Sequence, residues 1–260
     1  MTDPLESSRY SIEHAKRRID EFEAEVQRFS QTNPYIQVVE KDMNTAEDVY
    51  KIRLTKALPY TLKGIASDAV IALRAALDNA GYSVAVASGS KGKNAHFPFA
   101  GGVDEFKSSK YRRSSDIPKE ILALMLVCGP YKGGNNLLWA LNKLSNTRKH
   151  EFIVPIIGSS GPFSIKIGGG HGTKFMGRGP FSVGGTIWNG AKNELEYMRV
   201  GSGGEIDTDA NFRFTLFVAF GEVDVIHGQP AIGVLRAMTD EVERILMAIE
   251  GEAKRIGVFN

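Results

Sequence analysis

Apolar residues recur every three or four positions in several long stretches of the chain, which is the spacing of one buried face of an α-helix. The first stretch ends at Asn33-Pro34, and Ser11 is its expected N-cap. In the second stretch, Gly64 and Gly81 are the points where a kink or break is easiest. The pattern predicts helices over residues 11–30, 59–87, 117–128, 134–148 and 232–256.

Shorter segments alternate between apolar and polar residues, which is typical of half-buried β-strands. Segments 35–41 and 49–56 are joined by a short polar linker, so we expect an antiparallel hairpin within residues 35–57. After residue 150 the chain is rich in glycine and in strand-forming residues. Further strands are expected at 163–167, 181–184, 194–200 and 212–220.

The order of these segments predicts an α+β fold, because the alternating units of a parallel α/β sheet are missing. We expect a mainly helical, bundle-like part over residues 1–150 that carries the N-terminal β-hairpin. An antiparallel β-rich part over residues 151–260 would follow, closed by the C-terminal helix 232–256. One continuous domain is the alternative to this division.

Composition narrows the class of protein. The chain has 260 residues and a formal charge of +2, which is too small to indicate nucleic-acid binding by itself. Its single cysteine, Cys128, lies in an apolar run and reads as a buried thiol that cannot form an internal disulfide. No apolar stretch reaches the roughly 20 residues of a membrane span, and the N-terminal residues lack the pattern of a secretion signal. We therefore expect a soluble, cytoplasmic protein with no membrane partner.

Several kinds of chemistry find no support. The loop 88–94 resembles the end of a phosphate-binding loop, but Asn94 stands where a magnesium-binding Ser or Thr would be needed. The glycines at 168–172 lie between expected strands and do not form a dinucleotide motif. The five histidines lack metal-ligand spacing, and Cys128 has no polar neighbour that would activate it. The sequence thus predicts no metal and no cofactor.

Polar and titratable residues gather where the expected helix 134–148 gives way to the β-rich part. Asn146, Arg148, Lys149 and His150 stand almost side by side in the sequence. Such a cluster at the end of an element is a candidate site. The interpretation we favour is a structural joint, since basic side chains are stabilised at a helix C-terminus.

A second polar group lies on the apolar helix expected at 59–87. Arg74 and Asp78 are four residues apart and therefore share one face, and Asn79 lies one step round the helix. One interpretation is a salt bridge along the helix. The other is a polar site shared with Asn146, Lys149 and His150.

Both groups belong to an ordered set of short motifs. These are the segment Leu73 to Asn79 (Leu-Arg-Ala-Ala-Leu-Asp-Asn), Phe97-Pro98-Phe99, the Gly129-Pro130-Tyr131 turn, and the segment from Leu137 to His150. The set resembles a widespread family of uncharacterised bacterial proteins in which similar motifs, including Leu-Arg-Ser-Ala-Leu-Asp-His, follow in the same order. The resemblance covers residues 35–155 well and the β-rich part loosely. It implies an architecture and no activity.

The same residues bear a weaker resemblance to the HEPN superfamily of helical domains, many of which are metal-independent ribonucleases of toxin and phage-defence systems. The signature of that superfamily is an arginine followed four to six residues later by a histidine. Here Asn79 occupies the histidine position after Arg74. The resemblance implies catalysis only if His150 substitutes for the missing histidine, with Lys149 or Arg74 stabilising the phosphorane charge.

Two functions remain open. The one we favour is a non-enzymatic binding or scaffold module. The alternative is a HEPN-like, nucleic-acid-associated protein or ribonuclease that uses His150, Arg74 and Lys149 for catalysis. The remaining polar residues of both groups, Asp78, Asn79, Asn146 and Arg148, would then bind the ligand. We expect RNA or another protein as the partner, and self-association through the C-terminal helix is a further expectation.

Overall fold

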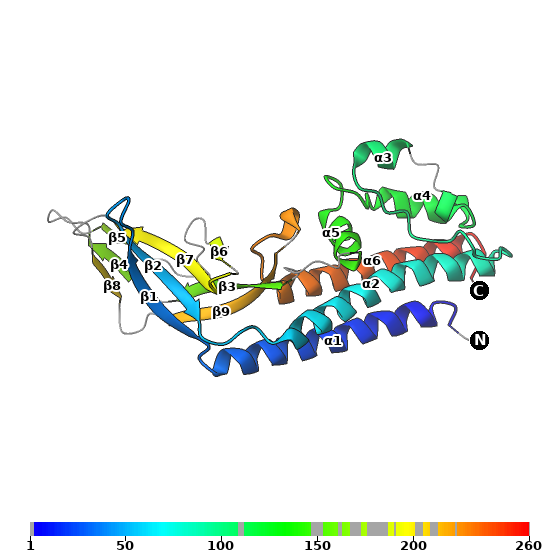
Figure 1. Ribbon diagram of the computed structural model, residues 1–260. Helices are drawn as coiled ribbons and strands as arrows, with labels where there is room; N and C mark the ends of the chain where they lie inside the picture. The colour runs from blue at the N-terminus through cyan, green and yellow to red at the C-terminus, as the bar shows by residue number, and fades with distance from the viewer. Residues whose placement is uncertain are drawn as a thin grey trace. The chain divides into compact units, whose positions relative to one another are not determined.

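The computed structural model describes residues 3–108, 112–146, 153–160, 163–166, 173–175, 187–189, 191–200, 205–208, 213–221 and 223–259. The α+β class expected from the sequence is confirmed. Figure 1 shows the long helices alongside one another, with shorter helices beside them. The described helices are α1 (Glu6–Gln31), α2 (Tyr60–Ala87), α3 (Val103–Ser108), α4 (Lys119–Val127), α5 (Asn136–Ser145) and α6 (Ala231–Arg255).

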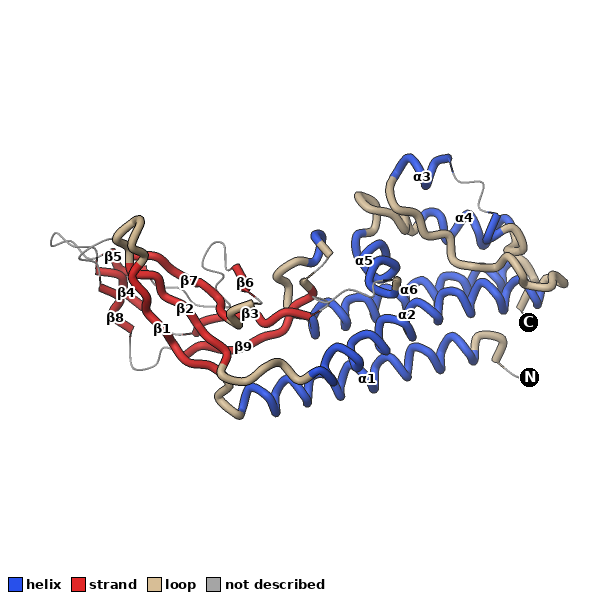
Figure 2. Tube along the Cα trace, in the orientation of Figure 1, coloured by secondary structure: helices blue, strands red, loops and turns tan. Residues whose placement is uncertain are grey.

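Among the described residues, the strands form three sheets, coloured red in Figure 2. Their orders are β1-β2-β7-β6, β3-β9 and β5-β4-β8. The strands are β1 (Tyr35–Lys41), β2 (Asp48–Leu54), β3 (Ile153–Ser160), β4 (Phe163–Lys166), β5 (Thr173–Phe175), β6 (Ile187–Asn189), β7 (Glu194–Val200), β8 (Glu205–Thr208) and β9 (Arg213–Phe220). The strand expected at 181–184 lies outside the described residues.

The chain divides into two compact units that do not follow chain order. The helical unit contains residues 1–23, 61–152 and 220–260, and the sheet unit contains residues 24–60 and 153–219. This grouping differs from the expected division at residue 150. The hairpin β1–β2 belongs with the later strands because β2 pairs with β7, and α6 belongs with the helices because it packs against α4 and α5.

Within the sheet unit, the expected hairpin is present and fully paired. Strands β1 and β2 are antiparallel and in register from Tyr35 opposite Leu54 to Lys41 opposite Asp48. Strand β2 then pairs antiparallel with β7. The carboxylate of Glu194 on β7 is buried, accepts a hydrogen bond from Arg53 of β2 and forms an ion pair with Lys51 at 3.6 Å, so its charge is neutralised where water is excluded.

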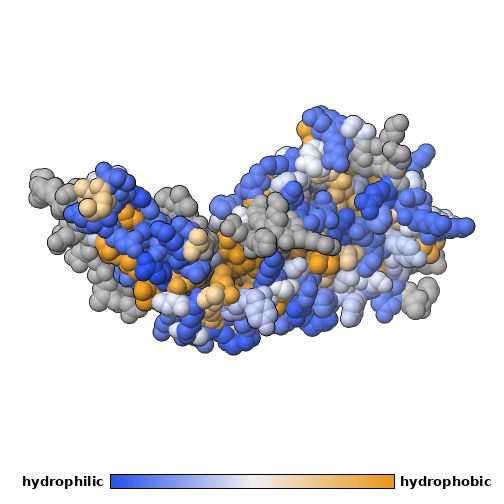
Figure 3. Space-filling model, viewed as in Figure 1, coloured by the Kyte–Doolittle hydropathy of each residue, from blue (hydrophilic) through white to orange (hydrophobic). Residues whose placement is uncertain are grey.

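A ladder of ion pairs joins helices α1 and α6. Arg9 pairs with Glu250, Lys16 with Glu243, and Arg236 with Glu23. Successive pairs are seven residues apart on each helix and run in opposite directions, so the two helices are antiparallel with the regular spacing of a coiled coil. Hydrophilic residues accordingly dominate the face of the helical unit seen in Figure 3.

The core of the helical unit lies between the apolar stripes of the long helices. In α6 the stripe expected from the sequence includes Leu235, Val242, Ile245 and Ile249, and all four side chains are fully buried. This apolar face of α6 therefore packs against other parts of the same chain. None of the described helices is long and apolar enough to cross a membrane.

The N-cap expected at Ser11 is wrong. Helix α1 begins at Glu6, and the Ser11 hydroxyl donates to the carbonyl oxygen of Ser7, 2.9 Å away, within the helix. The cap is Asp3, whose carboxylate accepts the backbone N–H of Leu5 at 2.9 Å. Asp3-Pro4 is a favourable helix start in its own right, because the carboxylate satisfies a free N–H group and proline lacks one.

Helix α2 passes through both of its glycines without a break. Gly64 has open space where a Cβ would stand, whereas at Gly81 a Cβ would lie 2.3 Å from the carbonyl oxygen of Ala95. Gly81 therefore lets the loop 94–101 approach the helix closely. This contact positions the polar residues of the candidate site.

Candidate functional site

The candidate site is built around an ion pair on helix α2. The guanidinium of Arg74 bonds to the carboxylate of Asp78, as their spacing of four residues predicts. The side chains of Arg74 and Asp78 are only 20% and 29% exposed, so the pair is largely shielded from water. Burial lowers the pKa of Arg74, and the charge of Asp78 opposes that shift.

Two further groups hold the guanidinium of Arg74. Its Cζ atom lies 4.1 Å from the centroid of the Phe99 ring, which is a close cation–π contact. Its Nε donates to the side-chain oxygen of Asn142, on helix α5, at 3.3 Å. Arg74 thus connects α2, the loop 94–101 and α5.

The carboxylate of Asp78 anchors the loop that follows α2. One of its oxygens accepts the backbone N–H of Phe97 at 2.8 Å. The same oxygen lies 3.8 Å from Nδ1 of His96, whose side chain is 43% exposed. The loop is also fixed on its other side, where His96 N–H donates to the carbonyl of Arg113 at 2.8 Å and the Ser114 hydroxyl donates to the carbonyl of His96 at 2.6 Å.

The two polar groups noticed in the sequence meet only in part. Asn146 caps the end of α5, and its amide donates to the backbone oxygen of Asn142 at 2.8 Å and to the side-chain oxygen of Asn142 at 3.3 Å. Asn142 therefore links Asn146 to Arg74. Asn79 points elsewhere, since its amide donates to the hydroxyl of Ser11 on α1 at 3.3 Å. Arg148, Lys149 and His150 lie outside the described residues.

Three residues of the cluster carry no clear signal in the sequence. Phe99 belongs to one of the ordered motifs, and Asn142 lies within the segment before His150, but neither pattern assigns a role. His96 reads as one of several ordinary loop histidines. Its only sequence signal is its place directly before the Phe97-Pro98-Phe99 motif, and its position beside Asp78 depends on how the loop folds back.

The loop 88–94 does not form a phosphate site in the described structure. The backbone N–H of Asn94 donates to the carboxylate of Asp116 at 3.2 Å, and Asp116 N–H donates to the carbonyl of Asn94 at 2.9 Å. The hydrogen bond from the Asn94 backbone is the main reason that the pKa of Asp116 is lowered, and the Lys93 backbone and Ser90 hydroxyl add to it. The loop therefore binds a carboxylate of its own chain.

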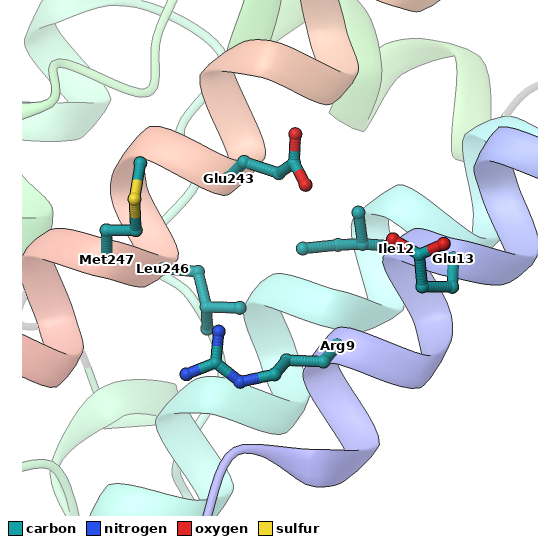
Figure 4. Close-up of a pocket in the computed structure, with 6 residues that line it drawn as sticks. All are labelled: Arg9, Ile12, Glu13, Glu243, Leu246 and Met247. Atoms are coloured by element: carbon teal, nitrogen blue, oxygen red, sulfur yellow. The ribbon is translucent and has the colours of Figure 1, made fainter.

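A pocket of about 380 Å³ lies between helices α1 and α6 in the helical unit. Figure 4 shows its apolar wall, formed by Ile12, Leu246 and Met247, with Arg9 and Glu243 at its rim. Arg9 is bound by Asp3 and Glu250. Glu243 is bound by Lys16. The rim charges are thus already paired, which leaves little to select a charged ligand.

The described part of the chain gives no support to a metal site or to a reactive thiol. Among those residues, no three His, Cys, Asp or Glu side chains gather closely enough to hold a metal ion. Cys128 is half-buried, and its burial raises the pKa of the thiol, which reduces the thiolate fraction near neutral pH. The candidate site is therefore the Arg74–Asp78 cluster, defined as Arg74, Asp78, His96, Phe99 and Asn142.

Comparison of the chain with family models, with curated proteins and with solved structures found no match.

Proposed function

We propose that the chain is a non-enzymatic binding or scaffold module and that the Arg74–Asp78 cluster is a structural joint within it. The observation that carries this proposal is the occupation of both charges by groups of the chain itself. Arg74 contacts Asp78, Phe99 and Asn142. Asp78 in turn accepts the backbone N–H of Phe97.

This arrangement is poorly suited to catalysis by Arg74. A guanidinium that stabilises a phosphorane has to turn its N–H groups toward the substrate. Turning away would leave the Asp78 carboxylate without its cation in a shielded position, which costs on the order of 1–3 kcal/mol. The same contacts are what a structural role requires, because they fix the loop 94–101 between α2 and α5.

We favour a protein over RNA as the partner. Binding to nucleic acid depends on cations that can approach phosphates, and the net charge of the chain is only +2. Among the described residues, Arg9, Lys16 and Arg236 are committed to the ladder between α1 and α6. The lone cysteine and the absence of a spanning helix among the described residues support a cytoplasmic setting for this module.

One observation favours a second candidate, the HEPN-like ribonuclease. The His96 side chain is 43% exposed, against 20% and 29% for Arg74 and Asp78, and its Nδ1 lies beside the Asp78 carboxylate. At 3.8 Å this contact is longer than a hydrogen bond, and a carboxylate that closes to bonding distance would orient the imidazole so that Nε2 acts as a base toward solvent. In this candidate His96 takes the role that the sequence assigned to His150, and it removes the proton from a ribose 2′-hydroxyl.

A cleavage assay separates the two candidates. The full-length protein is incubated with end-labelled single-stranded RNA in the presence of EDTA, so that metal-dependent contaminants are silent. His96→Ala and His150→Ala proteins are tested in parallel. His227→Ala serves as the matched control, because His227 is also exposed and lies outside the cluster.

The binding or scaffold proposal expects no cleavage above background by any of these proteins. Cleavage that is lost in His96→Ala or His150→Ala and retained in His227→Ala would overturn it in favour of the ribonuclease. Cleavage that survives all three substitutions would indicate a contaminating nuclease. The proposal then requires that the cleavage disappears after a further purification step.

A further inference from the structure

From residue 69 to its end, helix α2 has an outer face without free charges. Residues 69–87 contain only two charged side chains, Arg74 and Asp78, and these bind each other. Helix α1 instead alternates charged residues along its outer face, many of them in ion pairs with α6 or within α1. A helix of a soluble monomer normally carries charge on the face opposite the core, so this part of α2 is unusual.

Apolar side chains occupy that face. Ile71, Tyr82 and Val86 are 51%, 53% and 44% exposed, and Ala75 is partly exposed between them. At about 100° per residue, these four positions fall within a sector of about 60°. We call them the α2 stripe. In Figure 1 this helix is the cyan ribbon.

The largest residue of the stripe is held in place by the loop that follows the helix. A Cβ at Gly92 would lie 2.6 Å from the Tyr82 ring and 3.4 Å from a methyl group of Val86. The glycine backbone therefore packs directly against both side chains. A ring fixed before binding loses little conformational entropy when a partner covers it, so Tyr82 is prepared for a contact.

The sizes of the stripe residues match one another about a two-fold axis. In an antiparallel pair of α2 helices centred between Asp78 and Asn79, Ile71 lies opposite Val86, and Ala75 lies opposite Tyr82. Both pairs have the same centre, and the large ring of Tyr82 meets the small side chain of Ala75. We propose that the α2 stripe is the contact surface for a second copy of this chain, arranged antiparallel about that axis.

The residues at the axis are compatible with such a contact. Arg74 neutralises Asp78 within each copy, so two like charges do not meet unpaired. Asn79 is half-buried beside the axis, and its amide is already hydrogen-bonded to the hydroxyl of Ser11 on α1 at 3.3 Å, so it does not bring an unpaired polar group into the contact.

The size of the stripe sets the expected affinity. Ile71 to Val86 span about 22 Å of helix, at 1.5 Å per residue. A contact of that length and one helix width buries less than the roughly 800 Å² per partner of a standard interface. We therefore expect a reversible dimer with a Kd on the order of micromolar, with α1 and the loop 88–94 adding to the contact.

A second copy fits this face better than an unrelated partner does. The two-fold match of residue sizes is a property that only a self-contact requires. The apolar stripe of α6, the surface first expected to self-associate, is buried within the chain, which leaves α2 as the exposed apolar helix face among the described long helices. This inference does not depend on whether the Arg74–Asp78 cluster is structural or catalytic.

Sedimentation of the full-length protein over a range from about 1 to about 200 µM tests the proposal. The wild-type chain should shift from monomer to dimer across that range. Ile71→Glu places two carboxylates in the contact and should weaken association at least roughly tenfold, as expected for a charge buried in an apolar interface. Met247→Glu is the matched control, because Met247 is similarly exposed on α6, and it should dimerise like the wild type.

Cross-linking tests the antiparallel arrangement independently. In a Cys128→Ser background, Ile71→Cys combined with Val86→Cys should form disulfides between two copies, since the two positions face each other. Ile71→Cys alone should not, because it lies about 22 Å along the helix from its counterpart, far beyond the roughly 7 Å limit between Cα atoms.

Each outcome bears on the proposal. Monomeric wild-type protein throughout the range, or a dimer that persists in Ile71→Glu, would overturn it, as would a disulfide formed by Ile71→Cys alone. Circular dichroism spectra of the variants establish that they are folded. If Ile71→Glu does not fold, the cross-linking result decides, because cysteine at these exposed positions leaves the core untouched.

Discussion

Asp78 is the residue on which most contacts of the candidate site depend. Asp78→Asn keeps the shape of the side chain but removes the charge opposite Arg74. Because Arg74 is largely buried, an unpaired guanidinium should lower the free energy of unfolding by about 1–3 kcal/mol, less than for a fully buried pair. The measurement is urea unfolding followed by circular dichroism.

Asp68→Asn is the matched control for that prediction. Asp68 also lies on α2 and pairs with Arg18 at 2.9 Å, but its side chain is 52% exposed. An exposed ion pair contributes about 0–1 kcal/mol, so this substitution should have a small effect. Equal losses in the two variants would contradict the view that Asp78 is special because it is shielded.

The contacts of Asp78 also show which features of the candidate site can be predicted from the sequence and which cannot. The pairing with Arg74 follows from a spacing of four on one helix, which is a local property. His96, Phe99 and Asn142 come from a loop and from another helix, and their positions depend on packing that no spacing encodes. The sequence places Asn79 next to Asp78 on the helix and says nothing more about it. Its hydrogen bond to Ser11 could not be predicted, because the sequence does not show where α1 lies.

At the scale of elements, Gly81 determines how closely α2 and the loop 94–101 approach. In Gly81→Ala the new methyl group would lie 2.3 Å from the carbonyl oxygen of Ala95, so the loop backbone must move. The cost of such overpacking is about 1–3 kcal/mol and exceeds the gain of about 1 kcal/mol in helix propensity. We expect a lower unfolding midpoint in thermal and urea melts.

Gly64→Ala should change stability in the opposite direction. Gly64 lies in the same helix, and no neighbouring group lies within 4 Å of the position that an alanine methyl group would take. The propensity gain then acts alone and should raise the free energy of unfolding by about 0.5–1 kcal/mol. Two variants that both stabilise or both destabilise would show that the close contact at Gly81 does not control the packing.

The elements themselves were largely predictable because their signals are local. The period of apolar residues placed α2 at Tyr60–Ala87 and α6 at Ala231–Arg255, within a residue or two of expectation. It failed at the start of α1, where the Asp3-Pro4 cap outside the apolar period begins the helix at Glu6. Helix α3 was also missed, since its six residues are too few to show a period.

At the scale of the whole molecule, the grouping of elements was not predictable from their order. The sequence suggested a boundary at residue 150, where composition changes. The structure instead pairs β2 with β7 and packs α6 on α4 and α5, so each unit combines segments that are far apart in the chain. Strand and helix partners are chosen by complementary faces, and one sequence does not reveal which faces complement each other.

Carboxylates bound by cations or N–H groups should make the whole molecule sensitive to acid. The pKa of Glu241 is lowered mainly by hydrogen bonds from Arg244, and that of Glu250 mainly by Lys254 and then by Arg9. When the folded pKa lies below the unfolded value, the unfolded chain binds more protons between the two. These groups therefore stabilise the fold fully above the unfolded value of about 4 and lose that contribution as pH falls through the folded pKa.

Glu241→Gln tests this account at one position. Its amide cannot be ionised, so the variant should have a lower thermal midpoint than the wild type near neutral pH. The difference between the two should shrink as pH falls below about 4, because the wild-type carboxylate is then protonated as well. Thermal melts at a series of pH values measure it. A difference that stays constant down to about pH 2 would mean that Glu241 acts through packing, and the ion pair with Arg244 would then contribute little to the acid response of the molecule.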